Sequence, residues 1–137
     1  MNKTRITIAV ILLLLFLFAN IYAIRQLTRY GVELYFYDKM LVAYQIGGMR
    51  GLNEELESVL LQKEMPRQLA VAKTFEKNLG DLKAPDKFLR DVTGDLRKKI
   101  DLYRMLRIVA FVLILIIFLF RLVINLSARA KITGGKL

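Results

Sequence analysis

The side chains available for chemistry in this chain are carboxylates, lysines and tyrosines, because the sequence contains no cysteine and no histidine. Without cysteine, thiolate nucleophiles, disulfides and cysteine-based metal sites are excluded. Without histidine, the chain lacks the usual general base near neutral pH and the commonest ligand of transition metals. We therefore expect no catalytic residue, no metal site and no cofactor, in a protein that is not an enzyme.

Three carboxylates that lie close together in the sequence, on Glu54, Glu55 and Glu57, are the best candidates for holding a cation. Helical positions i, i+1 and i+3 do not converge on one point. We interpret these residues as the solvent-exposed face of an amphipathic helix whose other face carries Leu52 and Leu56.

Tyrosines and leucines form two columns that repeat every seven residues, with an offset of three: Tyr30, Tyr37 and Tyr44, and Leu27, Leu34 and Leu41. This a/d pattern predicts a helix that packs through one seam. The tyrosines have two interpretations, as packed rings or as a ligand cage or partner-binding seam. Packing is favoured, but three consecutive aromatic residues at positions 35–37 indicate contact with more than one neighbour. The candidate partner-binding residues are Asn20, Tyr30, Tyr35, Phe36, Tyr37 and Tyr44.

Two long apolar segments flank these residues. Residues 6–24 carry no charge, and residues 108–126 carry only Arg121. Each segment has about 19 residues, or roughly 28 Å of helix, which matches a hydrocarbon core about 30 Å thick. We predict that both segments are transmembrane helices.

The residues between the two segments predict a helical extramembrane domain, residues 25–107. Glycines at 47, 48 and 51 predict a hinge, and Pro66 and Pro85 suit helix starts. The predicted elements are an N-terminal tail (1–5), a stalk (25–46), short helices (52–65 and 67–80), a second stalk (86–107) and a basic C-terminal tail (127–137). The predicted fold is an all-α integral membrane protein. It is an antiparallel helical hairpin of two long helices, each with a transmembrane and a water-exposed part, and two short helices at the far end.

Two polar residues, Asn20 and Arg121, lie inside the predicted spans, where polar residues are expensive and usually functional. An antiparallel pair puts Asn20 near Val112 and Arg121 near Ile11, so we expect neither to find a partner within the chain. Arg121 can extend to lipid headgroups, and Asn20 can hydrogen-bond another chain. Neither span carries an acidic residue, which disfavours an ion or proton path.

The net charge is +10, with no acidic residue before Glu33 and none after Asp101. Basic residues beside membrane segments usually meet anionic headgroups. No basic stripe with interleaved aromatic residues supports nucleic-acid binding, so we expect none. The candidate headgroup-binding residues are Lys3, Arg5, Arg104, Arg107, Arg121, Arg129 and Lys131.

Lys3 and Arg5 before the first segment predict a retained signal anchor with a cytoplasmic N-terminus, although cleavage stays an alternative. Two spans put both termini on one side. We expect cytoplasmic termini and an extracytoplasmic middle domain in a bacterial inner membrane. The basic residues at 97–107 fit a cytoplasmic middle domain almost as well.

The outline of membrane, domain and membrane resembles bacterial sensor proteins, but residues 127–137 are too few for a signalling module. We expect a non-catalytic accessory or structural subunit of a membrane protein complex. It would dock through its transmembrane faces and aromatic stalk, with membrane lipids and other membrane subunits, or copies of itself, as partners. The alternative is an extracytoplasmic helical ligand-binding or sensing module that acts through a membrane partner.

Overall fold

The computed structural model describes residues 2–62 and 65–134, and within these ranges it contains three helices and no strand. Helix α1 spans Lys3–Leu61, α2 spans Pro66–Leu79 and α3 spans Pro85–Gly134. The predicted all-helical class is therefore confirmed. Two helices, α1 and α3, are long and apolar enough to cross a membrane.

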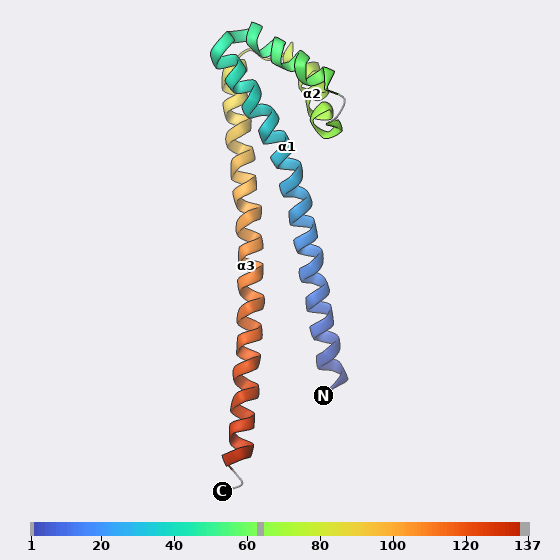
Figure 1. Cartoon of the computed structure of the whole chain (residues 1–137), viewed down its shortest axis with the longest axis vertical. Helices are drawn as coiled ribbons and strands as arrows, with labels where there is room; N and C mark the ends of the chain where they lie inside the picture. Colours follow the sequence, from blue (N-terminus) through green and yellow to red (C-terminus); the bar gives the residue numbers. More distant parts are fainter. Residues whose placement is uncertain (1, 63–64, 135–137) are drawn as a thin grey trace.

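The long helices α1 and α3 lie side by side and run in opposite directions, so that both termini lie at one end (Figure 1). Helix α2 packs against α1 at the other end. We call this end, built from the described part of residues 36–100, the head. Pro66 and Pro85 are the first residues of α2 and α3, where a missing backbone N–H costs nothing.

Helix α1 changes direction at Gly48, whose φ of 61° and ψ of −148° are not helical. Glycine adopts such a conformation readily because it has no Cβ. The predicted hinge is thus confined to one glycine, and the helix resumes at Met49, before the predicted start at Leu52. The predicted helix 52–65 is therefore corrected to the last part of α1, which ends at Leu61; residues 63–64 lie outside the described residues.

A second glycine, Gly51, lies where the two parts of α1 approach each other most closely. A Cβ at this position would lie 2.5 Å from the carbonyl oxygen of Ala43. The reversal at Gly48 and the contact at Gly51 together let α1 fold back over its own stalk.

The head encloses one hydrophobic core to which every helix contributes. Its buried members are Phe36 and Met40 before the reversal, Leu52, Leu56 and Val59 after it, Ala72 and Phe75 on α2, and Leu89 on α3. The Phe75 ring meets Phe36 and Tyr37 edge-on, with ring centroids 5.7 and 5.8 Å away. Burying each large apolar side chain contributes about 1.5–3 kcal/mol, so the core holds the reversal closed.

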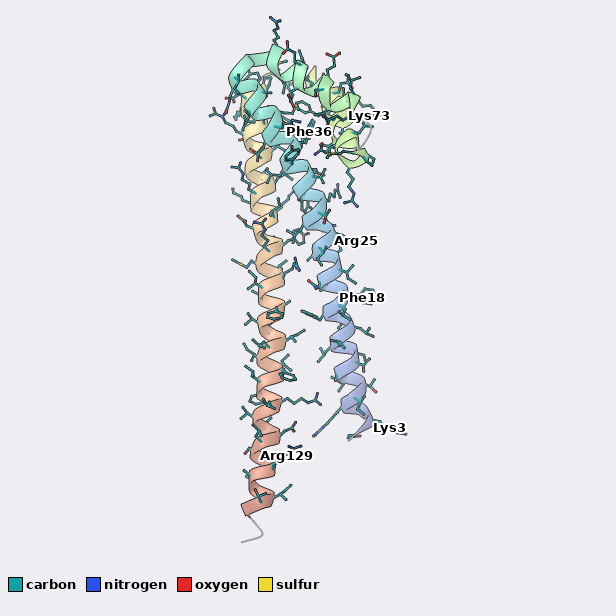
Figure 2. All side chains as sticks on the ribbon, viewed as in Figure 1. Lys3, Phe18, Arg25, Phe36, Lys73 and Arg129 are labelled. Atoms are coloured by element: carbon teal, nitrogen blue, oxygen red, sulfur yellow. The ribbon has the colours of Figure 1, made fainter. Side chains whose placement is uncertain are left out.

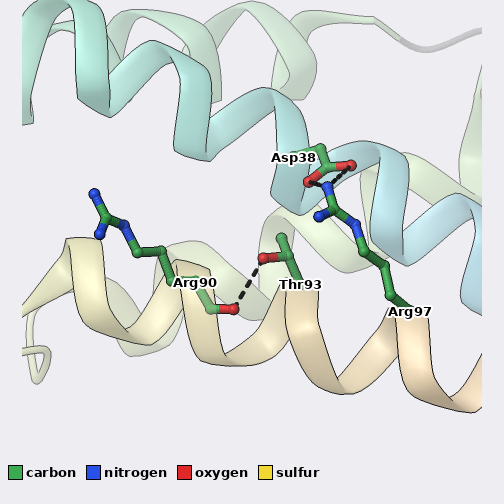
Figure 3. Close-up of polar contacts among 4 residues, drawn as sticks. All are labelled: Asp38, Arg90, Thr93 and Arg97. Carbon is green, nitrogen blue, oxygen red and sulfur yellow. Dashed lines mark hydrogen bonds and ion pairs between the residues drawn. The ribbon is translucent and has the colours of Figure 1, made fainter.

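Below the core, α3 faces α1 with Thr93, Leu96 and Ile100, all of them buried. The Thr93 hydroxyl donates to the carbonyl oxygen of Arg90 at 3.0 Å, which satisfies it inside its own helix (Figure 3). A threonine can therefore occupy a buried position without a partner on α1.

An ion pair also joins the two long helices beside this seam. Arg97 Nη2 on α3 donates to both carboxylate oxygens of Asp38 on α1, at 3.0 and 3.3 Å (Figure 3). Both side chains are partly exposed, so the pair contributes about 1 kcal/mol at most. The ion pair therefore adds little to the free energy of folding, but its geometry favours this alignment of the two stalks.

The packing between α1 and α3 ends near Ala23. In residues 6–24 Ala23 is the only buried residue, and in residues 108–126 every residue except Ala110 and Ile114 is exposed. The helices diverge towards the termini, and their side chains project on all sides (Figures 1 and 2). The two apolar segments therefore leave most of their surface uncovered.

Gly51→Ala should destabilise the head, because the new methyl group must displace backbone atoms of Ala43. Overpacking of this kind costs about 1–3 kcal/mol. Gly47→Ala is the matched control, since no atom lies within 4 Å of a Cβ there and helix propensity favours alanine. Thermal unfolding in detergent, followed by circular dichroism, should give a lower Tm for the first variant alone. Equal Tm values would contradict the close approach.

Candidate functional site

The aromatic residues of the stalk divide into core and surface residues. Phe36 is 1% exposed in the head core, and Tyr37 and Tyr44 are half-buried against it. These three side chains contact the chain's own helices. Tyr35, in contrast, is 57% exposed and points away from the core, with Lys39 Nζ 6.0 Å from its ring centroid.

Tyr37 keeps its proton at neutral pH. Burial raises the pKa of its hydroxyl above the ordinary value, and the nearby Glu33 carboxylate raises it further. A neutral phenol packs in an apolar environment at lower cost than a phenolate. Tyr37 is therefore suited to packing and hydrogen bonding, and it is poorly suited to act as a nucleophile.

A second tyrosine cluster lies where the stalks meet the spans. Tyr103 on α3 lies 5.8 Å from Tyr30 and 6.4 Å from Tyr22, measured between ring centroids. The pKa of the Tyr103 hydroxyl is raised, mainly because the group loses hydration and to a smaller extent because of the neighbouring Tyr22 and Tyr30. Lys99 Nζ lies 5.4 Å from the Tyr30 ring centroid, a cation–π contact that accommodates a charge beside the seam. Tyr22 was missed in the sequence because its partner is 81 residues away.

The expectation that Asn20 has no partner within the chain is wrong. Arg107 Nε donates to Asn20 Oδ1 at 3.1 Å. Residue counting placed Asn20 near Val112, but the long guanidinium side chain of Arg107 reaches Asn20 from a position five residues earlier in α3. Arg107 and Asn20 line a groove of about 400 Å³ between the helices, together with Phe16, Arg104, Ile108 and Phe111.

Arg121 lines another groove between the two apolar segments, together with Arg5 and apolar side chains. The expected neighbour Ile11 does not line this groove, and within the described residues no ion pair involves either arginine. The remaining candidate headgroup-binding residues, Lys3, Arg104, Arg129 and Lys131, are all exposed. Helix α3 continues through Arg129 and Lys131 to Gly134, so most of the predicted tail is helical; residues 135–137 lie outside the described residues.

A hollow of about 820 Å³ lies between α1 and α2, directly beyond the first apolar segment. Three arginines, Arg25, Arg29 and Arg67, line it, with Glu33 and Tyr37. Arg29 Nε lies 3.3 Å from Glu33 Oε1, which leaves more positive than negative charge in the groove. The sequence does not reveal this group of arginines, because Arg67 joins the other two only when α2 folds back onto α1.

The carboxylates of Glu54, Glu55 and Glu57 do not form a common cation site. Glu54 pairs with Arg50 at 3.1 Å, and Glu55 pairs with Lys39 Nζ at 3.0 Å. No group of three or more metal-ligating side chains occurs in residues 2–62 and 65–134. The polar groups in this part of the chain are arranged for surface ion pairs.

Comparison with known proteins gives no assignment: the chain matches no protein-family model and has no significant similarity to a curated protein or to a solved structure.

Phe36→Ala should destabilise the head by about 3–5 kcal/mol, because it removes the centre of a closed core. Tyr35→Ala, one residue earlier, should change the free energy of unfolding by no more than about 0.5 kcal/mol. Denaturant titration of both variants measures the difference. Comparable losses would show that Tyr35 also belongs to the core, and would remove it from the candidate partner surface.

Proposed function

We propose that this protein is a non-catalytic accessory or structural subunit of a membrane protein complex. It is inserted as an antiparallel hairpin of the segments 6–24 and 108–126. The observation that carries the proposal is the contrast between a closed head core and two apolar segments that cover little of each other's surface. A chain of this kind needs lipid or other subunits around its spans.

The spans are suited to lateral contact. Residues 6–24 turn Ala9, Phe16, Asn20 and Ala23 towards α3, since these are the less exposed positions of the segment. The leucine-rich remainder of the helix faces outward, where hydrocarbon or a neighbouring helix can cover it. Asn20 is already satisfied by Arg107, so apolar packing is what remains for docking at this level.

An exposed stripe on the stalk offers a second docking surface. Tyr35, Val42 and Ile46 are spaced by seven and four residues, which places them on one helix face. All three are exposed, Ile46 to 84%. A shallow groove of about 430 Å³ follows this stripe and also includes the Lys39–Glu55 ion pair. An apolar heptad stripe with a charged edge suits a helix of another subunit.

A photoreactive amino acid at Ile46 should crosslink to a neighbouring chain in intact membranes. The same group at Lys73, an exposed position on α2, is the control and should give little adduct. Gel shifts and mass spectrometry of the adducts distinguish a second copy from another subunit. A clean monomer in mild detergent, with no adduct at Ile46 in native membranes, would refute the proposed role.

The orientation that we propose has both termini in the cytoplasm and the head outside it, in a bacterial inner membrane. Lys3 and Arg5 before the first span support it. The chain has no native thiol, so a cysteine introduced near Glu55 and treated with a membrane-impermeant reagent reports the side directly.

A ligand-binding or sensing module is the second candidate function, and the groove of about 820 Å³ between α1 and α2 supports it. Tyr37 lines this groove beside Arg25 and Arg67, a combination suited to an anionic ligand. Replacement of Tyr30, Tyr37 and Tyr44 by Phe together should preserve packing. Native mass spectrometry of protein from its own membranes would then show whether a small ligand is lost with the hydroxyl groups. A wild-type protein that carries no such ligand would leave only the structural role.

A further inference from the structure

The groove between the two spans, near their terminal ends, combines two positive charges with apolar walls. Arg5 on α1 and Arg121 on α3 both line it. Its walls include Ile8 and Leu12 from α1 and Ile117 and Phe118 from α3. The groove has a volume of about 400 Å³ and is partly open.

Within residues 2–62 and 65–134, neither arginine has an acidic partner. No acidic residue precedes Glu33 or follows Asp101, so neither apolar segment brings a carboxylate side chain to this depth. Charged side chains inside a bilayer are stable only when they are paired or reach the headgroup level. An anionic group bound in the groove can supply the counter-charge for Arg5 and Arg121.

The proposed insertion puts the two arginines close to the phosphate level of the membrane. Arg5 directly precedes the first apolar segment, and Arg121 lies five residues before the end of the second. Five helical residues rise about 7.5 Å, a distance that an arginine side chain covers by extending along the helix. A guanidinium group binds phosphate oxygens through paired N–H donors, so two of them can hold one phosphate.

The apolar part of the groove is suited to an acyl chain. The walls between Leu12 and Phe118 are aliphatic and aromatic, and a flexible hydrocarbon chain can adapt to such a surface. The apolar walls and the two positive charges thus favour the same occupant.

We propose that this groove is a binding site for one phospholipid, whose phosphate pairs with Arg5 and Arg121 and whose acyl chain lies between the spans. The site presupposes the membrane insertion proposed above. The lipid fills the space that the diverging helices leave and supplies the charge that Arg121 lacks. This bound lipid is a specific part of the folded hairpin, whereas the lipids of the surrounding bilayer exchange freely.

The test measures retention of phosphatidylglycerol by the purified full chain, using native mass spectrometry over a lipid titration. The double variant Arg5→Gln/Arg121→Gln should weaken lipid binding by about tenfold or more, the equivalent of about 1.4 kcal/mol. Lys73→Gln/Lys77→Gln is the matched control, because it removes the same charge from exposed positions on α2 and neither residue lines the groove. The control should bind lipid within about twofold of the wild type. Equal losses in both variants would overturn the site in favour of general surface attraction.

A second pair of measurements separates a lipid from a free anion. Phe118→Ala, which shortens the apolar wall, should weaken phosphatidylglycerol binding. Glycerol phosphate without acyl chains should compete poorly with the lipid for the wild-type protein. Efficient competition, or an unchanged affinity of the Phe118 variant, would overturn the lipid assignment.

Flotation of the wild-type protein with vesicles of phosphatidylglycerol and phosphatidylethanolamine separates the two proposals. A chain that does not float refutes membrane insertion and the lipid site with it. A chain that floats, but binds lipid equally with and without the two arginines, refutes only the site. Loss of a crosslinked partner chain in the arginine variant, with lipid binding unchanged, would assign the two charges to that partner and also overturn the site.

Discussion

The packing of Phe75 against Phe36 and Tyr37 is the interaction on which the rest of the structure depends. It joins α2 to the stalk of α1 after the chain has reversed at Gly48, and it encloses Met40 and Leu89 in the same core. This closure brings the start of α3 back beside the stalk of α1. The direction of the second long helix, and the meeting of Arg97 with Asp38, therefore follow from a small core at one end.

This dependence explains why the molecule is ordered so differently at its two ends. In the head, apolar side chains from four helical segments exclude water and determine a single packing. Beyond Ala23 the helices share few contacts, and hydrogen bonds such as that of Arg107 to Asn20 replace close packing. In a bilayer, exposure of these leucines to lipid costs no free energy, because lipid tails are as apolar as leucine side chains. Under the proposed insertion, the uncovered faces of the two segments leave room for lipid and for other subunits.

The sequence predicted the features that depend on local chemistry. Apolar periodicity predicted the long helices, the prolines predicted the starts of α2 and α3, and the glycines predicted the reversal. It could not predict which of three consecutive aromatic residues enters the core, since that depends on where α2 folds back onto α1. The heptad columns selected Tyr37 and passed over Phe36 and Met40, which are more deeply buried. The partner of Asn20 and the grouping of Arg67 with Arg25 were missed for the same reason, because both depend on tertiary packing.

Distances between spin labels in the reconstituted protein test most directly the central claim, a head that holds together two helices that are open in the membrane. One pair of labels, on cysteines replacing Asp38 and Arg97, reports the head, and a second pair, replacing Ile6 and Leu122, reports the terminal ends of the spans. We predict a short, narrow distance distribution for the first pair and a longer mean distance for the second, because α1 and α3 diverge along the spans (Figure 1). A second pair as close as the first would contradict the account, since the spans would then cover each other and leave no space for lipid.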